Sequence, residues 1–217
     1  MKRLVLKFGG TSVGTIEQIK KVANIVKSRH QEGNEIIVIV SAMSGTTDDL
    51  KEKSNLISKN FESKELDVLL SSGEQVSSSL LSGALIDKGI KSRSWLGWQI
   101  PIITNDNHTA SQIIKIKTDE ILKFISDGGV AVIAGFQGIT KNGRITTLGR
   151  GGSDLSAVAI AKFFKTDSCE IYTDVEGVLT TDPNLHEKAK KIEKISYEEM
   201  LEMASLGAKV MQPSAVQ

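Results

Sequence analysis

The chain has 217 residues, with 27 Lys or Arg against 26 Asp or Glu, so its formal net charge at pH 7 is +1. This near balance argues against a protein that binds a polyanion, and no apolar run approaches the roughly 18 residues of a membrane-spanning helix. The lone cysteine, Cys169, excludes an intramolecular disulfide and fits a reducing compartment. We therefore expect a cytoplasmic protein without nucleic-acid or membrane partners.

The chain opens on a short apolar strand at residues 4–6, followed by a lysine, two glycines and two hydroxyl residues. Because Gly9 and Gly10 lack a Cβ atom, their N–H groups can come close to a ligand. Thr15 then begins a helix and stands three residues before Gln18, which is the spacing of a capping box. A strand, a glycine turn and a helix in this order favour an anion site, for example for phosphate, although a tight turn with a surface lysine fits the same pattern.

The rest of the chain alternates strands with helices. Continuous apolar runs, typical of parallel strands covered on both faces, span Glu35–Val40 and Val130–Ala134. The pair Asn142-Gly143 predicts a β-hairpin. Helices are expected near residues 16–33, 48–60, 66–86 with an interruption at 71–74, 118–126, 154–164 and 196–207. Further strands are expected at 92–98, 100–103 and 170–173, which together give an α/β domain with a mostly parallel sheet.

Small and hydroxyl-bearing residues follow several of these strands. The clusters begin at Gly9, Ser41, Gly135 and Asp174, and residues 149–154 form a fifth. Since ligands of such sheets bind at the carboxyl ends of the strands, these turns favour a nucleotide or phosphate site. The fingerprints G-x-x-x-x-G-K-[ST] and G-x-G-x-x-G are both missing, as are the protein-kinase signatures. A phosphotransferase would need a different phosphate cradle.

Six motifs resemble, in the same order, the signatures of the aspartate kinases within the amino-acid kinase superfamily. They are K-F-G-G-T-S-V at 7–13, S-A-M-S-G-T-T at 41–47, S-G-E-Q at 72–75, T-L-G-R-G-G-S-D at 147–154, T-D-V-E-G-V at 173–178 and G-A-K-V at 207–210. The resemblance implies a three-layer α/β/α sandwich in which residues 1–217 form the catalytic domain. Residues 1–125 would be its amino-acid-binding half and 126–217 its nucleotide-binding half.

The chemistry that this resemblance implies is transfer of the γ-phosphoryl group of ATP, with Mg²⁺, to the side-chain carboxylate of L-aspartate. The product, 4-phospho-L-aspartate, leads to lysine, threonine, methionine and diaminopimelate. Because a carboxylate is ionised at pH 7, the reaction needs no general base, and catalysis consists of positioning and charge neutralisation. Lys7 is the candidate for the neutralising charge. Asp154 either holds Lys7 or caps the following helix.

For the amino acid, Arg150 offers a planar fork that matches an α-carboxylate, and Glu74 offers a negative charge to the α-ammonium. The substrate-binding residues implied by the resemblance are Thr47, Glu74, Arg150, Gly151, Gly152 and Ser153. Each of these two residues also has an explanation that involves no substrate. Glu74 could be a solvated carboxylate at the start of a helix, and Arg150 could belong to a surface salt bridge.

The nucleotide side rests on the resemblance alone. The residues that it implies are Lys7, Phe8, Gly9, Gly10, Ser12, Ser41, Thr173, Asp174, Leu179, Asp182, Asn184, Lys209 and Val210, with no metal held by the protein itself. The alternative explanation of Ser12 is that it caps the start of a helix. The chain departs from the family where Leu179 replaces an aromatic residue and Asn184 an arginine, and we expect the loss of this ring and this cation to weaken ATP affinity. It departs again where Gln212 replaces a histidine and Ser214 an arginine. The histidines match no motif and are expected at the surface: His30, His108 and His186.

In the family, a further helix and strand and then paired regulatory ACT domains follow G-A-K-V, so we expect a catalytic domain that is incomplete at its C-terminus and has no ACT domains. We also expect a homo-oligomer. Two other functions fit parts of the pattern: an amino-acid kinase for glutamate or uridylate, and a truncated or degenerate kinase fold that acts as a binding or partner subunit. Release of ADP that depends on aspartate would discriminate between them.

Overall fold

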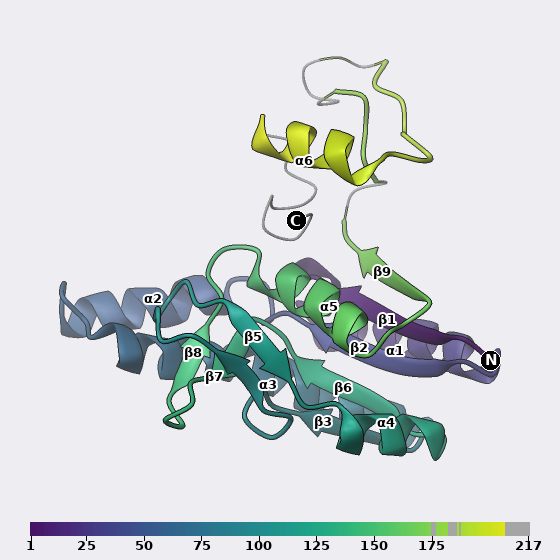
Figure 1. Cartoon of the computed structure of the whole chain (residues 1–217), viewed down its shortest axis with the longest axis horizontal. Helices are drawn as coiled ribbons and strands as arrows, with labels where there is room; N and C mark the ends of the chain where they lie inside the picture. Colours follow the sequence, from purple (N-terminus) through teal and green to yellow (C-terminus); the bar gives the residue numbers. More distant parts are fainter. Residues whose placement is uncertain (175–176, 182–185, 187, 207–217) are drawn as a thin grey trace.

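The computed structural model describes residues 1–174, 177–181, 186 and 188–206, and its centre is a five-stranded sheet (Figure 1). The strand order is β3-β6-β2-β1-β9, and every neighbouring pair is parallel. These strands are β1 (Arg3–Phe8), β2 (Glu35–Val40), β3 (Ser92–Trp95), β6 (Val130–Ala134) and β9 (Ser168–Tyr172). A mixed four-stranded sheet has the order β5-β4-β7-β8. Its strands are β4 (Ile102–Thr104), β5 (Ile113–Ile116), β7 (Gln137–Ile139) and β8 (Ile145–Thr147).

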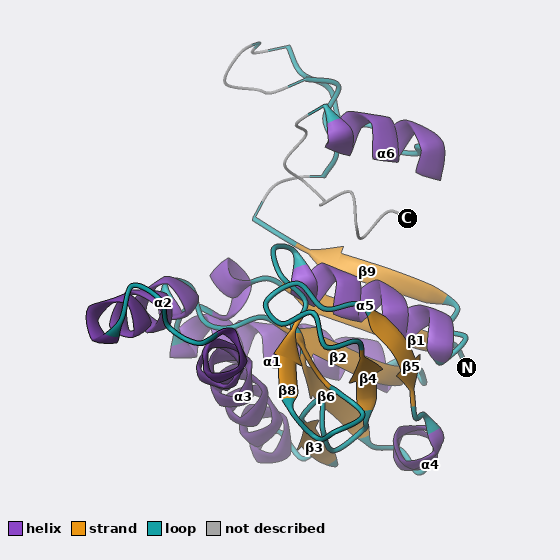
Figure 2. Ribbon diagram, turned by 60° about the vertical axis from the view of Figure 1, so that its left-hand side comes forward, coloured by secondary structure: helices purple, strands orange, loops and turns teal. Residues whose placement is uncertain are grey.

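Helices cover both faces of the five-stranded sheet (Figure 2). α1 (Ile16–Gln31) and α3 (Ser63–Asp87) pack on one face, and α4 (Asp119–Ser126) and α5 (Gly152–Phe163) pack on the other. The remaining helices are the short 3₁₀ helix η1 (Gly10–Val13), α2 (Thr46–Ile57) and α6 (Tyr197–Ser205). Alternate residues of β2 serve two cores: Ile36 and Val38 pack with α1 and α3, whereas Ile37 and Ile39 pack with α4 and α5. The predicted α/β/α sandwich with a parallel central sheet is therefore confirmed. No helix in the described part of the chain has the length and apolar character needed to cross a lipid bilayer.

Local sequence signals set several boundaries as expected. The Thr15 hydroxyl accepts a hydrogen bond from the Gln18 N–H at 3.2 Å and so caps α1. Ser196 and Glu199 form a full capping box at the start of α6. β7 and β8 form the predicted hairpin, and Gly143 in its turn has a φ of +80°. These features depend only on residues close together in sequence, which is why they are predictable.

Three expectations about the elements are wrong. α3 runs without interruption through residues 71–74, because the Ser71 and Ser72 hydroxyls donate to carbonyls three residues earlier within the helix. β3 ends at Trp95 instead of continuing to residue 98, since the Leu96 N–H donates to the Gln99 side chain in a turn. The sequence analysis also omits β5, a strand of the second sheet.

Gly73 lies where α3 meets the loop after β2. A Cβ atom at this position would stand 2.7 Å from the Cβ of Ala42, closer than two carbon atoms can approach. We expect Gly73→Ala to lower the free energy of unfolding by about 1–3 kcal/mol, because overpacking outweighs the gain in helix propensity. The matched control is Gly83→Ala in the same helix, where a Cβ would meet nothing within 4 Å, and it should stabilise the protein by about 1 kcal/mol. Urea unfolding of both variants checks this, and equal effects would contradict the packing argument.

Candidate active site

A cleft of about 350 Å³ opens at the carboxyl ends of β1 and β2, between α3 and α5. Its walls come from the end of β1 with the turn after it, the loop after β2 with the start of α2, α3, the loops that follow β6 and β8, and the first turn of α5. The residues that line it are Lys7, Gly10, Ser41, Ala42, Met43, Ser44, Gly45, Thr47, Asp48, Glu74, Phe136, Gly149, Arg150, Gly151, Gly152, Ser153 and Asp154. This is the sheet edge at which the sequence predicted a ligand.

Lys7 and Asp154 form an ion pair at the floor of the cleft, with 2.6 Å between Nζ and Oδ1. β1 lies between β2 and β9, so the backbone of Lys7 is fixed on both sides by parallel pairing. Asp154 lies in the first turn of α5, and its side chain does not cap that helix. The expected contact between the two residues is present. The Lys7 ammonium is thus held in place at the cleft before any ligand arrives.

Glu74 lies in the middle of α3 and is only 3% exposed. One of its carboxylate oxygens, Oε1, accepts a hydrogen bond from the Ala42 N–H at 3.0 Å, while Oε2 has no partner among the described residues. Burial raises the pKa of this carboxyl group to about 7, and the bond from Ala42 opposes the shift. The alternative explanation of Glu74 as a solvated carboxylate at a helix start is therefore wrong.

A glycine-rich loop carries Arg150 to the opposite wall. Gly149 and Gly151 flank it with φ values of +76° and +72°, a conformation that residues with side chains rarely adopt. Arg150 is exposed, lines the cleft and has no carboxylate partner within the part of the chain that the structure describes. The alternative of a surface salt bridge therefore finds no support. Ser153 and Thr47 add hydroxyl groups to the same cleft.

Several residues predicted for the nucleotide do not line this cleft. Phe8 stacks on Tyr172 with ring centroids 4.6 Å apart, and the Gly9 N–H donates to the Tyr172 carbonyl at 3.4 Å. The expectation of a free N–H at Gly9 is therefore wrong, because that group extends the pairing of β1 with β9. Ser12 lies half-buried in η1.

The remaining nucleotide predictions fall beyond β9. Thr173 and Asp174 are exposed there and hydrogen-bond to each other, while Leu179 pairs with Lys191 in an isolated bridge. Residues that lie outside the described part of the chain are Asp182, Asn184, Lys209, Val210, Gln212 and Ser214. The structure therefore gathers the predicted amino-acid side together with Lys7, Gly10 and Ser41, and leaves the rest of the nucleotide side as a prediction.

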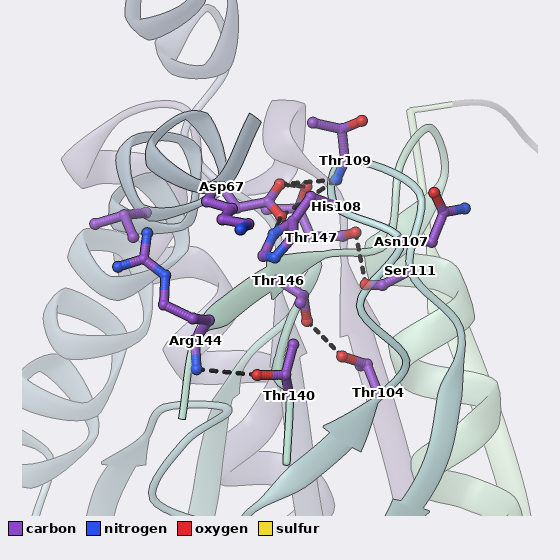
Figure 3. A network of polar contacts seen from close by, with 12 residues as sticks. Asp67, Thr104, Asn107, His108, Thr109, Ser111, Thr140, Arg144, Thr146 and Thr147 are labelled. Carbon is purple, nitrogen blue, oxygen red and sulfur yellow. Dashed lines mark hydrogen bonds and ion pairs between the residues drawn. The ribbon is translucent and has the colours of Figure 1, made fainter. Parts of the chain in front are cut away.

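Two features were missed by the sequence analysis. Phe136 lines the cleft with a φ of +67°, and its N–H donates to the Ser156 hydroxyl at 2.9 Å. The glycines on either side of Phe136-Gln137 marked a turn there but gave it no role. His108 was expected at the surface, yet its side chain is only 7% exposed and its Nδ1 lies 2.6 Å from Asp67 (Figure 3). His186 is exposed as expected, whereas His30 is half-buried.

Charged groups of both signs line the cleft. Lys7, which pairs with Asp154, and Arg150 line the same cleft as Asp48 and the buried Glu74. The Oε2 atom of Glu74 has no hydrogen-bond partner among the described residues. Within the described residues there is no group of three or more His, Cys, Asp or Glu side chains that would hold a metal ion.

Known proteins provide an independent comparison. The chain is 51% identical to an aspartokinase of Geobacillus stearothermophilus, over 99% of this chain and 53% of that protein. Its structure resembles an aspartate kinase from Synechocystis with a TM-score of 0.88 and 48% identity, over 99% of this chain and 35% of that one. It also resembles E. coli aspartokinase III in complex with aspartate and ADP, with a TM-score of 0.87 and 27% identity, over 99% of this chain and 59% of that one.

The chain spans about half the length of the curated relatives that it matches. The six motifs and these relatives agree on the same group of enzymes, which confirms the resemblance drawn from the sequence. A family model described as the amino acid kinase family matches residues 2–217. The chain therefore belongs to the amino acid kinase family.

Proposed function

We propose that this protein transfers the γ-phosphoryl group of ATP to the side-chain carboxylate of L-aspartate, producing 4-phospho-L-aspartate and ADP. An aspartate carboxylate oxygen forms a bond to the γ-phosphorus, and the bond from that phosphorus to the bridging oxygen of ADP breaks. Lys7 would offset the negative charge that builds up on the transferring group. No proton needs to be moved, because the attacking carboxylate is already ionised at pH 7.

One observation carries this proposal: the free Oε2 of Glu74 is buried in the wall of a cleft that also contains Arg150 and Lys7. An unpartnered buried carboxylate oxygen is costly, and an α-ammonium group would satisfy it. Arg150 would then bind the α-carboxylate, which leaves the side-chain carboxylate of the same amino acid free to face Lys7. Thr47 and Ser153 would complete the hydrogen bonds, and the backbone of Gly151 and Gly152 allows the close approach.

The nucleotide would enter as MgATP, with the cation held mainly by the phosphates, since the described residues provide no cage for a metal ion. Gly10 and Ser41 line the cleft near Lys7 and are the described candidates for contact with the phosphates. The adenosine would lie towards Thr173, Asp174 and Leu179, together with Asp182, Asn184, Lys209 and Val210. On this proposal both halves of the chain contribute to the amino-acid site, with Thr47 and Glu74 from residues 1–125 and Arg150 and Ser153 from residues 126–217.

The direct test is to trap the product. The purified protein, incubated with MgATP, L-aspartate and hydroxylamine, should form aspartyl hydroxamate, and ADP release should depend on aspartate. Parallel reactions with L-glutamate, L-asparagine and uridine monophosphate separate this function from that of another amino acid kinase. Aspartate binding without hydroxamate or ADP would instead support a non-catalytic binding module and overturn the proposal.

We further propose that the protein acts in the cytoplasm as a homo-oligomer. β9 and β3 are the edges of the five-stranded sheet in the described part of the chain, and such edges favour pairing with another chain. The thiol of Cys169, whose pKa burial raises to about 11, fits a reducing compartment in which it stays protonated. Light scattering coupled to gel filtration tests the oligomer, and a monomer at working concentration would contradict it.

Arg150→Lys tests the assignment of the amino-acid side. Lysine keeps the charge but loses the two-pronged hydrogen bonding, so the KM for aspartate should rise by about tenfold or more while the KM for ATP changes little. Steady-state kinetics with each substrate varied in turn checks this. The control is Arg144→Lys, at a partly exposed arginine that pairs with Glu65 at 2.7 Å outside the cleft, and it should affect neither KM. A rise confined to the KM for ATP would show that the two sides are assigned the wrong way round.

A further inference from the structure

One face of α3 carries polar residues at a helical spacing. Asp67, Ser71 and Glu74 stand four and three residues apart, so they lie on the same side of the helix. Asp67 contacts β8, the carbonyl of Ser71 accepts a hydrogen bond from the Gln137 side chain of β7 at 3.0 Å, and Glu74 binds the loop after β2. Polar residues that looked like a break in the helix are instead its anchors to the second sheet and to the cleft.

Asp67 is completely buried, and its carboxylate is fully engaged (Figure 3). The Thr147 hydroxyl donates to Oδ1 at 2.5 Å, the Thr109 N–H lies 3.1 and 3.2 Å from the two oxygens, and the His108 ring lies 2.6 Å from Oδ2. A buried carboxylate is tolerated because all of these groups stabilise it. Three segments are thereby joined at one point: α3, the loop after β4, and β8.

This point adjoins the loop that carries Arg150. Thr109 has a φ of +67°, which is unfavourable for a β-branched residue, and the contacts of its N–H with Asp67 hold it there. The carbonyl oxygen of Thr109 lies close to Gly149, the residue before Arg150, because a Cβ atom added to that glycine would stand only 3.1 Å from it. Ser111 donates to the Thr147 carbonyl through both its N–H and its hydroxyl, at 2.9 and 2.8 Å. The backbone is therefore held on both sides immediately before the glycine loop begins.

We propose that Asp67 and His108 are positioning residues that hold the loop at residues 149–154, and with it Arg150, at the amino-acid side of the cleft. This inference rests on the proposed function for its kinetic consequence. Neither side chain lines the cleft, so both act through Thr147, Thr109 and the backbone of the loop. Placing the anchor on α3 fixes Arg150 relative to Glu74, because both then depend on one rigid helix.

The test compares His108→Ala with His108→Asn, since an asparagine amide can replace the Nδ1–H donor to Asp67. The alanine variant should raise the KM for aspartate about tenfold and leave the KM for ATP within about twofold, because misplacing a binding group weakens only the ligand that it binds. The asparagine variant should regain most of the affinity. Asp67→Asn, which keeps the size of the side chain, should resemble the alanine variant. Equal rises in both KM values, or no rescue by asparagine, would overturn the proposal.

Hydrogen exchange separates this inference from the proposed function. Backbone amides of residues 148–154 should exchange faster in His108→Ala and Asp67→Asn than in the wild type, whether or not the protein phosphorylates aspartate. The control is the double variant Thr104→Val/Thr146→Val, which removes a buried hydroxyl pair 2.7 Å apart in the same sheet without touching Asp67. Because both partners are replaced by apolar groups of the same shape, the melting temperature should change little, and exchange in the loop should be unchanged. Unchanged exchange in the His108 and Asp67 variants would reject the inference even if the wild type is an aspartate kinase.

Discussion

Lys7→Ala is expected to lower kcat by about two to three orders of magnitude, while the KM for ATP rises less than about tenfold. The ammonium group is held 2.6 Å from Asp154, so it is oriented in advance towards the cleft. As the bond to the bridging oxygen breaks in the transition state, that oxygen carries more negative charge than it does in bound ATP. The lysine therefore contributes more to the rate than to nucleotide binding.

Removing Lys7 also leaves the Asp154 carboxylate half-buried without its cation. The variant Lys7→Ala/Asp154→Asn corrects for this effect, because it removes both charges and leaves the nearby backbone intact. The double variant should recover thermal stability but not activity, and Lys20→Ala, an exposed lysine on α1, should change neither. An undiminished kcat in Lys7→Ala would show that another group neutralises the transferring phosphoryl.

The parts of the fold that were predictable depend on local pattern. The six consecutive buried residues of β2 mark a strand covered on both faces, and the hairpin at Asn142-Gly143 follows from turn chemistry alone. The interruption expected at residues 71–74 shows the limit of this approach. Serine and glycine lower helix propensity, but in α3 these residues pack against other segments, and tertiary contacts outweigh propensity.

The residues of the candidate site also fall into two groups: those that a sequence motif predicted and those that only the structure revealed. Lys7, Glu74 and Arg150 were identified because each stands in a motif, and the structure brings all three to one cleft. The partnership of His108 with Asp67 had no signal, because the two residues are 41 positions apart and neither belongs to a motif. The position of Phe136 likewise follows from a backbone conformation, which no pattern of side chains specified. Contacts between residues that are distant in sequence cannot be predicted from a single sequence.

Glu74→Gln should lower kcat/KM for aspartate by about ten- to a hundredfold at pH 8 and remove its dependence on pH near neutrality. Burial raises the pKa of Glu74 to about 7, so the wild-type carboxyl group is partly protonated at neutral pH. Only the ionised form attracts the α-ammonium group of the substrate. The wild-type kcat/KM for aspartate should therefore rise with pH through about 7 and level off above it, while the glutamine profile stays flat there. An exposed carboxylate, Glu52 on α2, provides the control, since Glu52→Gln should leave the profile unchanged.

The same substitution should have the opposite effect on stability. The pKa of Glu74 is higher in the folded chain than its ordinary value of 4.5, so the folded chain holds this proton more tightly than the unfolded chain does. The resulting destabilisation is absent below about pH 4.5, grows as the pH rises and is complete above about 7. Glutamine carries no charge and keeps the acceptor for the Ala42 N–H, so Glu74→Gln should be more stable than the wild type at pH 8, by up to roughly 3 kcal/mol, and close to it at pH 5. Urea unfolding at the two pH values measures this difference. Loss of activity together with a gain in stability would show that Glu74 is retained for binding aspartate despite its cost to folding. A gain in stability with unchanged kcat/KM for aspartate would contradict its role in binding.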